Sequence, residues 1–260
     1  MPDAFYLPDG PDRFVATELT RGPWDPAAQH AGPPAALLGR AVERVGDRPD
    51  LHTARVTLEI PRPVPLGAVE VAARRLRGGR SVELVEATLS AAGTPVMQAT
   101  ALRIRRAELP PPAGQDGGRH LPGPERGREA PFFPTGQEVG YHTAMEWRFV
   151  TGSFLEPGPA TVWLRMRHPL VPDEAPSPLV RVLAAADSGN GVSAALDYRS
   201  WLFVNADLTV YLHRPAVGEW VALEAATTVD AGVGLADTAI HDRQGPVGRG
   251  LQALLVDRRR

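Results

Sequence analysis

An internal repeat constrains the fold of this chain more than any other feature of its sequence. "VTLEIPRP", which begins at Val56, and "LTVYLHRP", which begins at Leu208, are apolar-alternating runs that both end in Arg-Pro, 152 positions apart. Upstream, "AGPPAALLGRAVERVGD" from Ala31 resembles "APSPLVRVLAAADSGN" from Ala175. Two matched segments in the same order predict a chain built from two related units.

A stretch dense in Pro and Gly lies between the two copies. It reads "ELPPPAGQDGGRHLPGPERGREAPFFPTG", a composition typical of a linker that crosses the surface. We therefore predict an N-terminal unit over residues 1–107, a linker over 108–136 and a C-terminal unit over 137–260.

Each copy shows the same order of predicted elements, a strand, a helix and then three or four strands. In the first copy, Pro33 and Pro34 stand where a helix begins, because the first turn needs no N–H donors there. Gly78-Gly79 and Ala92-Gly93 are typical hairpin turns between the strands that follow. A helix followed by an antiparallel meander must pack on one face of its sheet, so we predict an α+β fold in which each sheet wraps around its helix.

Composition excludes several classes of function. The 260 residues carry a net charge of −2, which does not favour a bulk nucleic-acid or membrane binder. The absence of Cys excludes disulfides, thiolate metal sites and a Cys nucleophile. The seven His residues show no metal-binding spacing, so no metal is expected. The first residues lack the apolar core of a signal peptide and no run is long enough to span a membrane, which predicts a cytoplasmic protein.

The segments "QHAGPPAALL", "LAAADSGN", "NADLTVYLHRP" and "GRGLQALL" occur in an order that resembles the acyl-CoA thioesterase II-like family. This resemblance covers nearly the whole chain outside the linker and the extreme N-terminus. It implies a double hotdog, in which two antiparallel sheets each wrap around a long central helix. It also implies hydrolysis of acyl-CoA thioesters to free acid and CoA by an activated water, without a cofactor.

The family resemblance further implies a trio of residues that activates the water. The acidic residue on the second central helix falls on Asp187, and the Gln on the last strand falls on Gln252. The family's hydroxyl residue at the start of the intervening strand falls on Asn205, which departs from the pattern. An Asn side chain both donates and accepts hydrogen bonds, so it still suits a water-holding role.

The start of the first helix is the predicted site for the negatively charged oxygen of the reaction intermediate. Ala31 and Gly32 lie there, where free N–H groups and the helix dipole favour negative charge, and Gly32 allows close backbone approach. His30 precedes them, and it would either cap the helix or line the acyl pocket.

A chain with two copies has two geometrically equivalent sites. The repeat pairs Asp187 with Glu43, Asn205 with Thr53 and Gln252 with Thr100. We predict that the Asp187 site is active and that the Glu43 site is degenerate.

Two other functions remain open for the same fold. One is a hydratase or dehydratase of acyl thioesters, which a His close to Asp187 in space would favour. The other is a protein that binds acyl thioesters without hydrolysing them, for which the Asn205 departure is the main argument. Exposed sheet edges would favour a homodimer.

Overall fold

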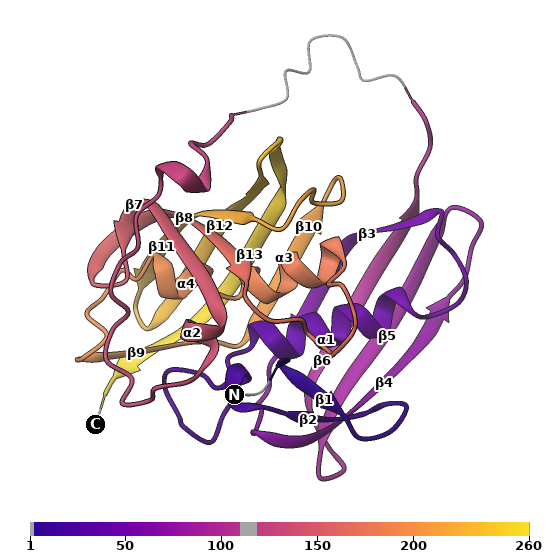
Figure 1. Ribbon diagram of the computed structural model, residues 1–260, viewed down its shortest axis with the longest axis horizontal. Helices are drawn as coiled ribbons and strands as arrows, with labels where there is room; N and C mark the ends of the chain where they lie inside the picture. The colour runs from indigo at the N-terminus through magenta and orange to yellow at the C-terminus, as the bar shows by residue number, and fades with distance from the viewer. Residues whose placement is uncertain (1–2, 110–118, 260) are drawn as a thin grey trace.

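The computed structural model describes residues 3–109 and 119–259 of the chain. Thirteen strands of this part form one antiparallel sheet that curves around two central helices (Figure 1). The first half of the chain supplies six strands: β1 (Tyr6–Pro8), β2 (Arg13–Ala16), β3 (Leu51–Glu59), β4 (Gly67–Arg77), β5 (Val82–Ala91) and β6 (Thr94–Arg105). The second half supplies seven: β7 (Met145–Ser153), β8 (Glu156–Met166), β9 (Trp201–Asn205), β10 (Asp207–Leu212), β11 (Val221–Asp230), β12 (Val233–Asp242) and β13 (Gly245–Arg258).

The prediction of two separate sheets is wrong, because β3 and β10 pair with each other. Their antiparallel register runs from Asp207 opposite Glu59 to Tyr211 opposite Arg55. The resulting order is β1-β2-β4-β5-β6-β3-β10-β13-β12-β11-β8-β7, and β9 also pairs with β13. The inner edges of the two half-sheets therefore satisfy each other's backbone hydrogen bonds.

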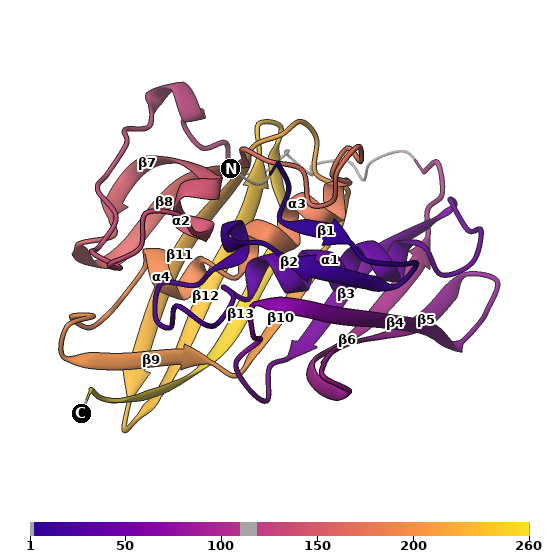
Figure 2. The same ribbon diagram turned by 60° about the horizontal axis from the view of Figure 1, so that its bottom comes forward.

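The central helices lie side by side, with the strands of the first half on one side and those of the second half on the other (Figures 1 and 2). Helix α1 (Gly32–Glu43) packs against β3, β4, β5 and β6, and α3 (Pro178–Ala186) packs against β8, β11 and β12. They have 12 and 9 residues, so the predicted long helices are shorter than expected. Gly189 and Gly191 follow α3 and disfavour its continuation, and the chain forms a separate turn, α4 (Gly189–Val192).

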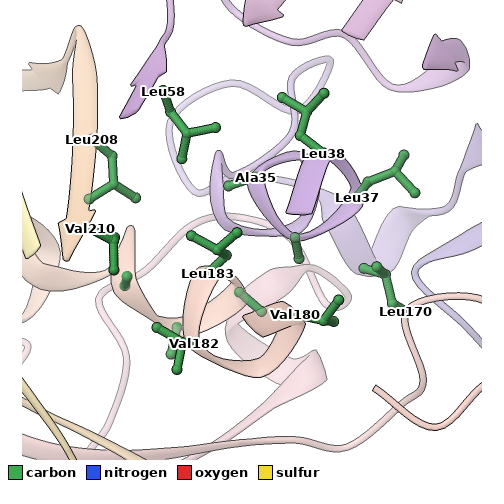
Figure 3. Packing of buried hydrophobic residues seen from close by; sticks show 14 of the residues in the cluster. Ala35, Leu37, Leu38, Leu58, Leu170, Val180, Val182, Leu183, Leu208 and Val210 are labelled. Carbon is green, nitrogen blue, oxygen red and sulfur yellow. The ribbon is translucent and has the colours of Figure 1, made fainter. Parts of the chain in front are cut away.

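The core lies between and around these helices. Leu37 and Leu38 of α1 are buried, and Leu183 of α3 lies on the side of α1 that carries Ala35, with Leu37 directed toward Leu170 (Figure 3). Residues 32–39 are all buried, which explains why the first turns of α1 are apolar on more than one face.

The predicted hairpin turn between β5 and β6 is confirmed. Ala92 and Gly93 have φ angles of 48° and 74°, the left-handed values that a two-residue hairpin of this type requires. Ala231 and Gly232 repeat the turn between β11 and β12 with φ angles of 46° and 86°.

The predicted linker is partly integrated into the fold. Residues 110–118 lie outside the described residues, but 119–136 pack against the second half of the chain. The indole Nε1 of Trp163 donates to the carbonyl of Pro122 at 2.7 Å, and Arg119 pairs with Glu224 at 2.7 Å. Phe133, near the end of the segment, is buried.

His241 on β12 lies close to this packed segment and gives the fold a predictable pH dependence. Its ring is buried 3.9 Å from Glu224, and neither ring nitrogen has a hydrogen-bond partner among the described residues. Burial lowers the pKa of His241 below its ordinary 6.5, and Glu224 only partly opposes this. The unfolded chain therefore takes up the proton more readily, so stability is present above about pH 6.5 and is lost as the pH falls toward the folded pKa.

We expect urea to unfold the protein at a lower concentration at about pH 5.5 than at about pH 7.5. A His241→Gln variant should show a smaller difference between the two conditions, since its side chain does not titrate. An unchanged difference in the variant would mean that this ring does not contribute to the loss of stability.

Candidate active site

The three residues predicted to activate water lie together in the structure. Asp187 caps the C-terminus of α3, Asn205 ends β9, and Gln252 lies on the inner face of β13. Asn205 Nδ2 donates to Asp187 Oδ1 at 2.7 Å, and Gln252 Nε2 donates to the Asp187 backbone oxygen at 3.2 Å. Gln252 Nε2 also lies 3.4 Å from Asp187 Oδ1. The Asp187 side chain is only 4% exposed, so the two amides stabilise a carboxylate that is almost removed from water.

Gln252 also fixes the chain that follows Asp187. Its Oε1 accepts from the Asn190 N–H at 3.1 Å, so one amide group holds both the end of α3 and the start of α4. The close approach depends on Gly189, where a Cβ atom would lie 2.4 Å from Thr238 Oγ1 and 3.0 Å from Gln252 Oε1. These contacts give Gln252, which is 1% exposed, a positioning role.

His30 faces Asp187 from the other half of the chain. Its Nδ1 lies 3.0 Å from Asp187 Oδ2, and its ring stacks on Tyr141 with centroids 3.8 Å apart. Burial lowers the pKa of His30, and the Asp187 charge only partly opposes this, so the ring is neutral at neutral pH. Nδ1 also lies 3.1 Å from the Gly32 N–H, and it can either accept from Gly32 or donate to Asp187, but not both.

Tyr141 belongs to α2 (Tyr141–Ala144) and supports this arrangement from below the His30 ring. Its hydroxyl donates to the Ala184 carbonyl at 2.6 Å and lies 2.9 Å from Ser188 Oγ. Burial raises the pKa of Tyr141, so the hydroxyl stays protonated and remains a donor. Sequence patterns did not indicate a role for this residue, because α2 is a single turn between a Pro/Gly-rich segment and a strand.

Gly32 brings the start of α1 against the last turn of α3. A Cβ atom at Gly32 would lie 2.4 Å from the Ala184 carbonyl oxygen, so only Gly allows this contact. The Gly32 N–H points to His30, whereas Ala31 lies in the wall of the cavity described below. Of the two predicted oxyanion residues, Ala31 therefore lies in the cavity wall and Gly32 does not.

A cavity of about 400 Å³ opens beside Asp187. Its wall includes His30, Ala31, Asp187 and Asn205, and therefore combines both halves of the chain. Gln252 is not part of the wall and lies behind Asp187. The larger apolar residues in the cavity wall are Trp24, Ile60, Val64, Val204 and Leu255.

A second, smaller cavity of about 40 Å³ adjoins it, and sequence reasoning missed its aromatic wall. The aromatic residues in this wall are Trp24, Phe132, Phe133, Tyr141, Trp147 and Phe154. Phe132 and Phe133 come from "PFFP" at the end of the predicted linker. Two adjacent Phe residues in a Pro/Gly-rich segment could have indicated that it packs against the protein, because large aromatic side chains are unfavourable in a solvated linker.

The opposite ends of the two helices form a related but different pocket of about 380 Å³. Glu43 and Thr53 line it, as the repeat predicts, and Glu43 accepts a 2.6 Å hydrogen bond from Ser177, the cap of α3. The predicted match of Gln252 with Thr100 is wrong, because Thr100 lies on the other face of β6. Thr57 pairs with Thr100, whereas Thr209, its counterpart in the repeat, pairs with Leu251, so the two copies differ by one residue along this strand. Ala101 therefore takes the inward position that corresponds to Gln252, and Arg103, the next inward residue, lines the pocket.

Arg103 is bound closely to its surroundings. Its Nη1 donates to the Val42 and Val45 carbonyls at the end of α1, at 3.3 and 2.8 Å, and lies 3.1 Å from Glu83, which is 1% exposed.

We expect Arg103→Met to lower the free energy of unfolding by about 3 kcal/mol, because it removes one partner of a buried carboxylate. Chemical denaturation would measure this. The matched control is Arg74→Met, which breaks the exposed Arg74–Glu86 pair and should cost less than about 1 kcal/mol. Equal losses in the two variants would contradict the assigned role of burial.

Neither a metal centre nor a membrane span is present in the described part of the chain. Over residues 3–109 and 119–259, no group of three or more His, Asp or Glu side chains is placed to hold a metal ion. No helix in these residues is long and apolar enough to cross a membrane.

Comparisons with known proteins agree with this architecture. A protein assigned as a thioesterase II from Thermobifida fusca is 18% identical, with a TM-score of 0.76 over 98% of this chain and 96% of that chain. A hot dog fold protein of unknown function from Alicyclobacillus acidocaldarius is 17% identical, with a TM-score of 0.74 over 99% and 97%. An acyl-CoA thioesterase II from Mycobacterium marinum is 16% identical, with a TM-score of 0.66 over 98% and 96%. At these identities the structures show a shared hotdog fold. No curated protein sequence matches the chain significantly.

Family models give the more direct result. The model of the acyl-CoA thioesterase N-terminal domain matches residues 20–104, and the model of the acyl-CoA thioesterase C-terminal domain matches residues 124–256. Both models occur in the expected order, and the second alone covers half of the chain. The chain therefore belongs to the acyl-CoA thioesterase family.

Proposed function

We propose that this protein hydrolyses acyl-CoA thioesters to a free acid and CoA, with Asp187 as the general base. The observation that carries the proposal is a carboxylate, 4% exposed, held by Asn205 at 2.7 Å at the wall of a 400 Å³ cavity. A base in a nearly dry site, fixed by amide donors, is suited to taking a proton from water. Membership of the acyl-CoA thioesterase family supports the same reaction.

The proposed reaction proceeds through a tetrahedral intermediate. A water held between Asp187 and Asn205 attacks the thioester carbonyl carbon, and its proton passes to Asp187. The carbon–sulfur bond then breaks, and the proton on Asp187 passes to the departing CoA thiolate. Gln252 holds the Asp187 backbone, and the start of α1 at Ala31 faces the oxyanion with the positive end of the helix dipole.

One observation favours a second candidate function. His30 Nδ1 lies 3.0 Å from Asp187, and an acid paired with a His is the arrangement expected of a hydratase or dehydratase acting on acyl thioesters. However, Nδ1 is directed at Asp187, so only Nε2 of the ring remains to face a substrate. Hydrolysis therefore remains the first proposal, with His30 as a positioning residue for Asp187.

A direct test follows the fate of two kinds of substrate. Hydrolysis predicts release of free thiol from saturated acyl-CoAs, whereas hydration predicts loss of the enoyl absorbance of a 2-enoyl-CoA without thiol release. The absence of Cys means that a thiol reagent detects released CoA alone. Enoyl loss without thiol release would establish the hydratase, and binding of acyl-CoA with neither signal would identify a binding protein.

A further inference from the structure

The two cavities are neighbours that share part of their walls. Pro23, Trp24, His30 and Asn190 line both of them. Asp187 lines the larger cavity, and its neighbours His30 and Asn190 line both, so the two arms of a thioester placed at Asp187 have a separate cavity each within reach.

The two directions differ in size and in chemistry. The cavity of about 400 Å³ includes Asp25, Gln29 and Arg62 in its wall, together with apolar residues. This combination fits a long arm that carries amide groups and ends in phosphates, such as the pantetheine arm of CoA. The cavity of about 40 Å³ has mainly aromatic walls and no charged carboxylate or guanidinium among its lining residues. An acyl group, which is apolar, fits the second direction.

Aromatic side chains in the wall of the small cavity pack against each other. The Phe132 ring lies 4.3 Å from the Phe133 ring and 4.4 Å from the Phe154 ring, measured between centroids. Phe133 in turn stacks on Trp24 at 5.0 Å, and Trp147 lies 4.9 Å from Phe154. Rings at these distances are in contact, so an acyl chain longer than the cavity has to displace them.

We propose that the aromatic cavity receives the acyl group and, through Phe132, restricts the protein to short acyl chains. This inference rests on the proposed function only in naming the ligand as an acyl thioester. A volume of 40 Å³ holds roughly three water-sized groups, which corresponds to acyl groups of about two to four carbons. Phe132 is the specificity-determining residue, because it contacts both Phe133 and Phe154 from a half-buried position on an irregular segment.

Binding of stable CoA thioethers tests this independently of hydrolysis. We would measure the Kd of S-butyl-CoA and S-octyl-CoA by calorimetry on the full chain. In the wild type, S-octyl-CoA should bind at least about 10-fold more weakly than S-butyl-CoA, since several additional methylenes lack a pocket. In Phe132→Ala, S-octyl-CoA should bind at least about 10-fold more tightly than it does to the wild type, with S-butyl-CoA changed less than about 3-fold.

The matched control is Phe149→Leu. Phe149 contacts Phe154 from the same aromatic cluster, at 4.8 Å, but does not line the cavity. It should leave the ratio of the two Kd values unchanged. A second variant, Phe132→Leu, opens the cavity less and should give an intermediate ratio even where the Ala variant folds poorly.

Three results would overturn the inference. These are equal binding of both thioethers to the wild type, no gain for S-octyl-CoA in either Phe132 variant, and an equal change in Phe149→Leu. Failure of the proposed hydrolysis shows separately, as the absence of thiol release from butyryl-CoA while S-butyl-CoA still binds.

Discussion

Asp187→Asn is expected to lower kcat for thiol release by about 100-fold or more. The substitution removes the base but preserves the shape of the side chain. Its amide oxygen can accept the hydrogen bond from Asn205, and its amide nitrogen can donate to His30 Nδ1, which lies 3.0 Å from the present carboxylate. The fold and the binding of substrate should therefore be retained while proton transfer is lost.

The measurement is kcat and KM for thiol release from butyryl-CoA, together with the unfolding transition of each protein. Asp237→Asn is the matched control, because Asp237 pairs with Arg249 on the outer face of the sheet. It should keep kcat within about 2-fold, as expected when an exposed ion pair is removed. A variant at Asp187 that retained more than about a tenth of the wild-type kcat would place the base elsewhere.

Gly32→Ala is expected to destabilise the fold and to reduce hydrolysis at the same time. A Cβ atom there would lie 2.4 Å from the Ala184 carbonyl oxygen, which is backbone and cannot rotate away. Overpacking of this kind lowers the free energy of unfolding by about 1 to 3 kcal/mol. The start of α1 must also move away from α3, which separates His30 from Asp187 and should lower kcat by about 10-fold or more.

Gly191→Ala provides the contrast in stability. A Cβ atom at Gly191 meets nothing within 4 Å, and the residue lies in α4, where Ala is the better helix former. Its free energy of unfolding should be equal to that of the wild type or higher by about 0.5 kcal/mol. If both Gly variants lost stability equally, the close contact between α1 and α3 would not be the cause.

Local sequence patterns predicted individual turns and strands better than the order in which the strands pair. The Ala92-Gly93 turn followed from Gly93, because Gly adopts a left-handed φ without steric cost, whereas the left-handed φ of Ala92 is unusual for a residue with a Cβ atom. The pairing of β3 with β10 did not follow, because alternation of apolar residues defines the faces of a strand but not its neighbour.

The candidate site shows the same limit. The family resemblance correctly brought Asp187, Asn205 and Gln252 together, although their sequence separation carries no such information. Counting along the repeat failed at Thr100, because the copies differ by one residue before the last strand, and a shift of one residue reverses which side chains face inward. The aromatic cavity was missed because Phe132 and Phe133 approach the site from a segment without periodicity.

The pairing of β3 with β10 also bears on how the two copies can diverge. In a symmetric dimer of single units, every substitution appears twice, so both sites change together. Here both copies lie in one chain and share one sheet, so a substitution appears once. His30 from the first copy contacts Asp187 of the second copy at one end of the helix pair. At the opposite end, Glu43 from the first copy accepts a hydrogen bond from Ser177. In a single chain, substitutions at the two sites are therefore independent, so the residues at one helix end can change while those at the other end are retained.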